Sequence, residues 1–530
     1  MHRTTIFLLL VTSAVSLHAV DRAGNWEQIN LEMSKGRPKS AIKLLEPLIE
    51  KSLAAKDYPE AVKGIGFRIK LEGDIEGRKA EERIARLHTE IEQAPNAMKP
   101  VLETLLGHWY WHYFQQNRWR FMQRTKTAEA PGDDIQTWDL ARIFAEIDTH
   151  FSAALAAAET LQAIPVKAWD GLLHKPGYTK YGDAINGVLD SYRPTLYDFL
   201  AHQALDFYRT GEQAGAKAQD AFELTSDSPV FDGPKAFLAW QLPTTDKTAN
   251  TVKALRLMQD LMRFHEQGED ISALIDVDLA RLVYAHNTAV GSEKADRYKA
   301  ALEHFVTENA DHRISARALA AWGQVLYDEG ERVAAHTLAS RGNTLFPHTP
   351  GGNQCYNLLQ QIESKSSQIQ AERVWNAPLP TISVTYRNLT EVHFRAVRYD
   401  WESLVTRKGW GWENLDLQQQ RELLKKKPVA AWTAVLPATD DYHDRQHLVP
   451  VPEGLEPGFY FLISSHTPGL EQLDNVASHT PFWVSDLALI LREQRRSDQL
   501  HGFVLDARHG RPVQGARIRT WVRGNHGEKR

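Results

Sequence analysis

Two histidines four residues apart are the first candidates for chemistry in this 530-residue chain. His108 and His112 in HWYWH have the spacing at which two helical imidazoles can bind one metal ion. The glutamate that serves as the base of an H-E-x-x-H motif is absent, because Trp occupies position 109. We therefore expect both histidines to lie in an aromatic core or groove, without metalloprotease chemistry.

A second histidine pair lies in DDYHDRQH, where His443 and His447 are accompanied by Asp440, Asp441 and Asp444. Imidazole and carboxylate groups together could hold a cation. The surrounding composition is that of a turn. We expect a polar surface loop here, with a cation site as the alternative.

The remaining reactive side chains also have structural interpretations. Cys355 is the single cysteine, so an intrachain disulfide is excluded. A nucleophilic thiol needs a base and a lowered pKa, and the helical pattern QCYNLLQQI indicates a small buried hydrophobe instead. Asp133, Asp134 and Asp139 are placed to cap the next helix rather than to act as an acid–base pair.

A short basic segment with interleaved aromatic residues resembles a small nucleic-acid patch. Its members are Arg118, Arg120, Arg124 and Lys126, with Trp119 and Phe121 between them. The net charge of the chain is −5, which gives no reason to expect a polyanionic partner. We expect a solvated face or pairing with carboxylates, and no nucleic acid. We assign no catalytic, cofactor-binding or metal-ligating residue, and we predict that the chain is not an enzyme.

The first nineteen residues have the pattern of a secretory signal peptide. Arg3 supplies the positive charge, Ile6–Val11 is the apolar run, and cleavage is expected between Ala19 and Val20. The apolar run is much shorter than the ~20 residues of a membrane span. We expect an exported, soluble protein of the periplasm or cell surface, and a chain without disulfides suits a bacterial periplasm.

Residues 20–376 are predicted to form a helical domain, because apolar residues recur at helical spacing along them. Within 316–349, a set of small and aromatic residues fits the 34-residue tetratricopeptide pattern. This predicts a tetratricopeptide-like α-helical solenoid, which binds a partner more often than it catalyses a reaction. The three clearest stripes are Ala41, Leu44, Leu45, Leu48 and Ile49; Leu102, Leu105, Leu106, Trp109 and Tyr113; and Leu140, Ile143, Phe144, Ile147 and Phe151.

Residues 377–491 are predicted to form a β-sandwich. The helical pattern reaches Trp375, and Pro378 and Pro380 then prevent its continuation. Alternating apolar residues predict strands on both sides of a turn at Asn388, and the strand count suits a sandwich. Further strands are expected at Val429–Leu436, Gly458–Ser464 and Phe482–Leu491, and a solvated helix is expected between Trp401 and Lys427.

Residues 492–530 contain one further hairpin. Phe503 and Leu505 alternate in its first strand, and Val513–Trp521 would form the returning strand. A hairpin alone is marginally stable in water. We therefore expect the start of a second, truncated β-sandwich, at the front end of a longer protein.

Several segments, in this order, resemble the bacterial alpha-2-macroglobulin-like proteins in their large form with a helical N-terminal region. These segments are NRWRFMQRT (Asn117–Thr125), DIQTWDLARI (Asp134–Ile143), RPTLYDFLAHQALDFY (Arg193–Tyr208), PGGNQCYNLLQQIE (Pro350–Glu363), PLPTISVTYRNLTEVHFRAVRYD (Pro378–Asp400) and VLDARHGRPVQGARI (Val504–Ile518). The resemblance implies helices followed by macroglobulin-type sandwiches. It also implies an endopeptidase inhibitor that traps proteases, in many members through a Cys-x-Glu-Gln thioester.

The thioester does not carry over to this chain, because Cys355 is followed by Tyr-Asn-Leu. No bait region can be assigned either. We expect this chain to be the N-terminal part of such a protease trap and to trap nothing by itself, the protease being a partner of the full-length parent. One alternative is a non-catalytic envelope scaffold that binds a protein partner through its helices. Another is a polysaccharide-active enzyme with a helical toroid, which would need two carboxylates in an aromatic cleft.

Overall fold

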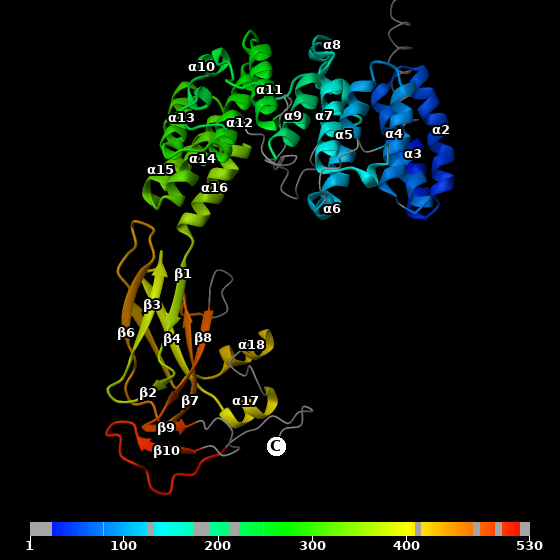
Figure 1. Ribbon diagram of the computed structural model, residues 1–530. Helices are drawn as coiled ribbons and strands as arrows, with labels where there is room; N and C mark the ends of the chain where they lie inside the picture. Colours follow the sequence, from blue (N-terminus) through cyan, green and yellow to red (C-terminus); the bar gives the residue numbers. More distant parts are fainter. Residues whose placement is uncertain are drawn as a thin grey trace, which may run out of the picture. The chain divides into compact units, whose positions relative to one another are not determined.

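The computed structural model consists of a helix-rich N-terminal part followed by strands arranged in sheets, as the sequence predicted (Figure 1). It divides into two compact units, Met1–Val325 with Gly342–Gln354 and Leu326–Arg341 with Cys355–Arg530. We call these the helical unit and the β unit. The residues that the structure describes are 24–77, 79–123, 132, 134–173, 191–210, 222–246, 249–408, 415–469, 477–492 and 501–519.

Amphipathic helices make up the first part of the chain, and the predicted stripes lie on their buried faces. Ala41 and Leu45 in α2 and Ile143 and Phe151 in α7 are fully buried. After a helix over 24–34, the helices are α2 (Pro38–Ala54), α3 (Tyr58–Ile75), α4 (Ala80–Gln93), α5 (Lys99–Gln116), α6 (Arg118–Gln123), α7 (Leu140–Leu155), α8 (Ala158–Gln162), α9 (Leu196–Tyr208), α10 (Pro234–Ala239), α11 (Asn250–His265), α12 (Ser272–Thr288), α13 (Lys294–Glu308), α14 (Ser315–Asp328), α15 (Arg332–Leu345) and α16 (Pro350–Glu363).

Glycines in the left-handed region close two of the interhelical turns. Gly36 has φ of 68° before α2, and Gly330 has φ of 90° between α14 and α15. Residues with a side chain rarely adopt this conformation, so each glycine fixes where one helix ends and the next begins. The helix pair expected within 316–349 is present as α14 and α15, with Ala335 and Ala339 fully buried.

Helices α5 and α7 pack closely because a glycine faces an aromatic ring. A Cβ added to Gly107 would lie 3.3 Å from the Phe151 ring, so any side chain at this position would require the ring to shift by a few tenths of an ångström. Phe114 and Phe144 meet at a centroid distance of 4.9 Å, and Phe207 of α9 stacks on Phe151 at 5.7 Å. This aromatic cluster is the core of the helical unit around α5.

Two sheets, antiparallel except for one strand pair, form a sandwich in the β unit. One sheet has the order β1-β3-β6, and the other has the order β2-β8-β7-β4-β5 with β2 parallel to β8. The strands are β1 (Ser366–Gln370), β2 (Val374–Trp375), β3 (Thr381–Arg387), β4 (Glu391–Arg398), β5 (Ala430–Val435), β6 (Arg445–Pro450), β7 (Gly458–Ser465) and β8 (Ala477–Val484).

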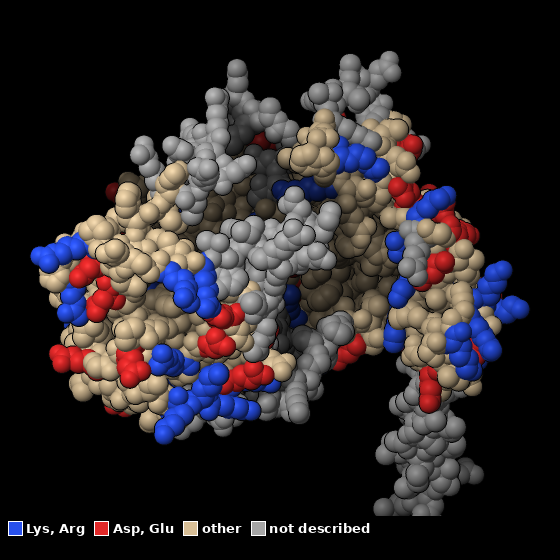
Figure 2. Space-filling model, turned by 90° about the horizontal axis from the view of Figure 1, so that it is seen from below, with Lys and Arg blue, Asp and Glu red and all other residues tan. Residues whose placement is uncertain are grey.

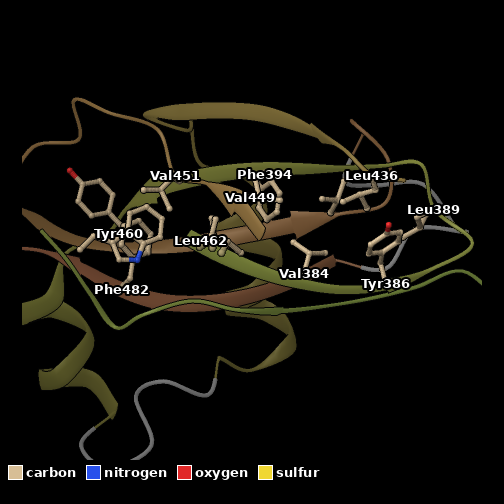
Figure 3. Close-up of a cluster of buried hydrophobic side chains, with 14 residues drawn as sticks. Val384, Tyr386, Leu389, Phe394, Leu436, Val449, Val451, Tyr460, Leu462 and Phe482 are labelled. Carbon is tan, nitrogen blue, oxygen red and sulfur yellow. The ribbon is translucent and has the colours of Figure 1, made fainter. Parts of the chain in front are cut away.

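The inner faces of the two sheets share one apolar core (Figure 3). Val384 and Tyr386 of β3 point toward Phe394 of β4 and Leu462 of β7, and all four are at most 1% exposed. The alternating burial of β3 and β4 confirms the strands predicted on each side of Asn388, whose φ of 57° makes the turn.

The helical insertion between β4 and β5 covers the outer face of the larger sheet. It forms α17 (Trp401–Lys408) and α18 (Leu417–Lys425). Leu404 and Leu423 pack with Phe459 and Phe461, which point away from the sandwich core. The expectation of a solvated helix was therefore wrong, because the insertion forms two helices and each of them carries a buried leucine.

Two predicted boundaries differ from the structure. The helical part ends at Glu363, and Val374–Trp375 form strand β2, because Trp375 stacks on Phe482 of β8 at 3.7 Å. The single strand expected over Phe482–Leu491 is two, since β8 ends at Val484 and β9 spans Leu487–Arg492. A bend at Ser485–Asp486 separates them.

The expected partner strand of the last hairpin was also wrong. Strand β10 (His501–Asp506) pairs with β9 in a separate two-stranded sheet, from His501 opposite Arg492 to Asp506 opposite Leu487. Within 513–519, which the structure describes, no residue belongs to a strand, and an isolated bridge joins Leu505 to Pro512. Thr520 and Trp521 lie outside the described residues.

We expect Phe394→Ala to lower the free energy of unfolding of the β unit by about 3–5 kcal/mol, because it removes a fully enclosed ring. Native-state hydrogen exchange of β4 and β7 measures this loss. Val435→Ala on β5 is the matched control, since the Val435 side chain is 78% exposed. Its expected change is within about 0.5 kcal/mol. Equal losses of protection in the two variants would contradict the core assignment.

Candidate functional site

An apolar groove of about 500 Å³ lies on the helical unit, between residues of α3, α4, α5 and α9. The volume is within the range of small-ligand and side-chain pockets. Phe67 of α3, Leu105 and Trp109 of α5, and Leu200 of α9 supply much of its apolar surface. A Cβ at Gly66 would meet no atom within 4 Å, so this glycine leaves part of the groove open.

Three cationic side chains line this groove. They are Lys63 and Lys70 of α3 and Arg83 of α4. Lys63 Nζ lies 4.2 Å from the centroid of the Trp26 ring, an interaction that holds the charge beside apolar surface. None of the three forms an ion pair in the part of the chain that the structure describes, and no described Asp or Glu lines the groove.

The two histidines of HWYWH do not share a site. His108 lines the groove, its Nε2 lies 2.8 Å from Oε1 of Gln203, and burial lowers its pKa. His112 is exposed, so the expectation that it also lies in an aromatic core or groove was wrong, and its Nε2 lies 2.8 Å from Gln116 Nε2. His108 is therefore the groove residue that we expected, and its imidazole is uncharged at neutral pH.

A different group of imidazoles and carboxylates gathers between α4, α5 and α7. The ligand atoms of His88, Glu146 and His150 all lie within 4.8 Å of one another. His150 Nδ1 lies 2.6 Å from Oε2 of Glu103, and His88 Nε2 lies 2.8 Å from Oη of Tyr110. Burial lowers the pKa of His88. For His150 burial also lowers the pKa, but Glu103 and Glu146 outweigh it and raise the value.

Sequence analysis missed this cluster, although one signal was present. Glu146 and His150 are four residues apart on α7, which places both on one face of the helix. His88 lies on α4. It comes close to α7 only through the packing of the helices, which a local sequence pattern does not predict. The pair in HWYWH has the same spacing of four residues, but His108 lines the groove and His112 is exposed, so the two imidazoles have different surroundings.

The basic segment does not form one patch in the described residues. Phe121 is fully buried, and Arg120 donates a hydrogen bond to Tyr113 Oη and lies over its ring. Trp119 is 75% exposed. Arg124 and Lys126 lie outside the described residues. Figure 2 shows one face of the molecule, on which described basic and acidic side chains are interspersed, as on a solvated surface.

Two of the predicted helix caps are present. Asp139 accepts a hydrogen bond from the backbone N–H of Arg142 at 2.8 Å and caps α7. Asp134 accepts one from the backbone N–H of Gln136 at 2.9 Å and caps the 3-10 helix Ile135–Thr137. Asp133 lies outside the described residues.

The second histidine pair falls in two different elements. His443 precedes β6, and its backbone N–H donates to Asp441 in a local turn. His447 is a residue of β6 and pairs with Val384. Asp441 accepts from Arg445 at 3.1 Å. Of the described residues, only the cluster on α4 and α7 brings three ligand groups together, so this loop remains a polar surface loop.

The sole cysteine is enclosed. Cys355 on α16 is fully buried, and burial raises the pKa of its thiol to about 12. The expectation of a buried small hydrophobe is confirmed. Ala19 and Val20, the predicted cleavage residues, lie outside the described residues.

No family model matches the chain, and no curated protein matches it. Of the described helices, none is both long and apolar enough to cross a membrane. The groove, the histidine–glutamate cluster and the β unit are the features of the molecule from which a function can be inferred.

We expect the thiol of Cys355 to be unreactive in the folded chain at pH 8, because a pKa of about 12 leaves it protonated. Titration with a disulfide reagent should detect no thiol in the native protein and one per chain in guanidinium chloride. Reaction of the native protein at the rate of free cysteine would show that the thiol is accessible and activated.

We expect the helical unit to lose stability below pH 6.5 because of His202 on α9. Burial lowers the pKa of His202 well below 6.5, and Arg193, Arg209, His265 and Arg317 add to this effect. The unfolded chain then binds a proton that the folded chain excludes, so stability falls as pH falls, by about 1.4 kcal/mol per pH unit for one site.

Denaturation of the helical unit at pH 7 and pH 5.5 measures this dependence. The variant His202→Gln should show a smaller loss between the two pH values, whatever its stability at pH 7. His112→Gln is the control, because His112 is exposed. An unchanged pH dependence in His202→Gln would show that other groups cause the loss.

Proposed function

We propose that this chain is a non-catalytic binding scaffold, the N-terminal part of an exported alpha-2-macroglobulin-like endopeptidase inhibitor. Its helical unit would dock a partner through the groove between α3, α4, α5 and α9. The observation that carries the proposal is the apolar groove edged by Lys63, Lys70 and Arg83, three cations without an ion pair in the described structure.

The chemistry of the groove favours an acidic segment of a polypeptide. Its walls are apolar and aromatic, so they gain free energy by covering leucine- or phenylalanine-sized side chains. Its cations would pair with Asp or Glu residues of the segment, which would also steer its approach. Gln203 and the uncharged His108 provide hydrogen-bonding groups within the groove.

Catalysis in the groove lacks support from its residues. A glycosidase needs two carboxylates flanking the bond that it cleaves, and no described carboxylate lines this groove. This observation favours binding over the alternative of a polysaccharide-active enzyme.

The resemblance to macroglobulin-type proteins gains support from the β unit. A two-sheet sandwich is followed by a separate sheet, β9–β10, as in a chain of successive β domains. The side chains of Leu489, Ile490, Leu491 and Phe503 in this sheet are each more than half exposed. Apolar faces of this kind are usually covered by further structure, which we propose is the remainder of a second sandwich.

An acidic peptide tests the docking groove. We expect a fluorescein-labelled peptide of alternating leucine and aspartate to bind the full chain with an affinity that falls as salt rises. A peptide of equal length with lysine in place of aspartate should not bind. Lys63→Glu/Lys70→Glu should weaken binding by at least tenfold, because it reverses two charges at the edge of the groove.

Two further variants separate the groove from general surface charge. Gly66→Phe should also prevent binding, since its ring would occupy the open space beside Gly66. Lys235→Glu on α10 is the control, because Lys235 is exposed and does not line the groove. Binding that survives Gly66→Phe, or that weakens equally in Lys235→Glu, would contradict docking in the groove.

The reading frame after the codon for Arg530 tests the family resemblance. We expect it to continue through further sandwich-patterned sequence. A Cys-x-Glu-Gln motif there would assign covalent protease capture to the longer protein. A stop codon directly after Arg530 would exclude the protease-trap part of the proposal and leave the docking groove to be tested alone.

A further inference from the structure

The histidine–glutamate cluster of the helical unit has an unexplained buried nitrogen. Nε2 of His150 has no hydrogen-bond partner in the described structure, and the His150 side chain is only 8% exposed. Its nearest carboxylate oxygen is Oε1 of Glu146 at 3.5 Å, which is longer than a good hydrogen bond. A buried polar atom without a partner is costly and therefore requires an explanation.

Glu103 decides which nitrogen of His150 carries the free lone pair. The distance of 2.6 Å between His150 Nδ1 and Glu103 Oε2 means that Nδ1–H donates to the carboxylate. In the neutral imidazole, Nε2 is then an acceptor directed into the cluster. A carboxylate behind a histidine, with the second nitrogen facing inward, is the usual outer partner of a metal-binding imidazole.

The spacing of the groups suits a small divalent ion. Zinc bonds of ~2.0–2.1 Å in tetrahedral geometry place neighbouring ligand atoms roughly 3.3 Å apart. The separation of His150 Nε2 and Glu146 Oε1 is 3.5 Å, and all three ligand atoms lie within 4.8 Å of one another. Small rotations of half-buried side chains would close the remaining gap.

The surroundings hold the ligands in place and supply negative charge. The ring of Tyr110 stacks on His150 at 5.4 Å and on Trp138 at 5.6 Å, and its hydroxyl contacts His88. Glu103 and Glu146 both face the cluster, and the one described cation that pairs with them is Arg142, 3.1 Å from Glu146 and 43% exposed. With neutral imidazoles the cluster is negative and would attract a cation.

We propose that His88, Glu146 and His150 form a zinc-binding site that links α4 to α7, with Glu103 positioning His150. Two imidazoles and one carboxylate suit zinc, whereas calcium and magnesium prefer oxygen ligands. Water would take the fourth position. The ion would connect α4 to α7 on the face of α5 that carries Glu103 and Tyr110. Neither of these residues lines the docking groove, so the two sites are independent.

Zinc titration of the full chain, made without a polyhistidine tag and stripped with a chelator, tests this site. We expect one zinc ion per chain in a competition assay with a fluorescent chelator. Cobalt should bind at the same site and give the visible absorption of a low-coordinate complex. Zinc should also slow hydrogen exchange in Ala80–Gln93 and Leu140–Leu155, because the ion joins these helices.

Variants assign the ligands. His88→Gln, Glu146→Gln and His150→Asn should each lower zinc affinity by more than tenfold and remove the cobalt absorption. Glu103→Gln should weaken binding by about 10–100-fold while retaining the cobalt absorption, because it changes an outer partner and not a ligand. His112→Gln is the control and should bind zinc as the unchanged chain does.

Two results would overturn the site. If the unchanged chain binds no zinc, Nε2 of His150 carries a proton that faces Glu146, and the imidazole is a cation held between Glu103 and Glu146. If zinc binding persists in the double variant His88→Gln/Glu146→Gln, the ion occupies a different place. Circular dichroism distinguishes loss of a ligand from loss of the fold, and hydrogen exchange of the unchanged chain decides the question if the variants do not fold.

Discussion

The helical unit depends on the burial of α5 on several sides at once. Gly107 admits the Phe151 ring of α7, and the neighbouring aromatic side chains complete the contact with α9. Close packing of this kind leaves little freedom in the rotation of α5 about its axis. One rotation then fixes two features: His108 and Trp109 face the groove, while Glu103 and Tyr110 face the histidine–glutamate cluster. The groove and the cluster are two sides of one packed helix.

Much of the fold follows from local pattern. Alternation places Val384 and Phe394 in the sandwich core, and the helical stripe places Ile143 and Phe151 in the helical core. The failures have physical causes. Trp375 becomes part of a strand because Phe482, distant in the sequence, offers it a stacking partner. The leucines of α18 are buried because the outer face of the sheet presents aromatic rings that need a cover.

The candidate sites were harder to predict from the sequence than the fold was. Groove residues such as Leu105 and Trp109 lie on a predicted stripe, but a stripe does not show which of its members remains half-exposed. The cluster joins Glu146 and His150, a visible helical pair, to His88 on another helix. The spacing of residues within α7 can identify Glu146 and His150, but it cannot identify His88, which lies on α4. The orphan nitrogen of His150, which distinguishes the cluster from an ordinary ion pair, is a property of the packed structure alone.

Strand β7 is enclosed on both faces, since Tyr460 and Leu462 enter the sandwich core and Phe459, Phe461 and Ile463 lie under α17 and α18. An uncharged apolar strand of this kind is prone to self-association when it is uncovered. Both covering helices precede β7 in the chain. Strand β4, with which β7 pairs, also precedes β7. During synthesis from the N-terminus, α17, α18 and β4 are therefore made before β7 leaves the ribosome.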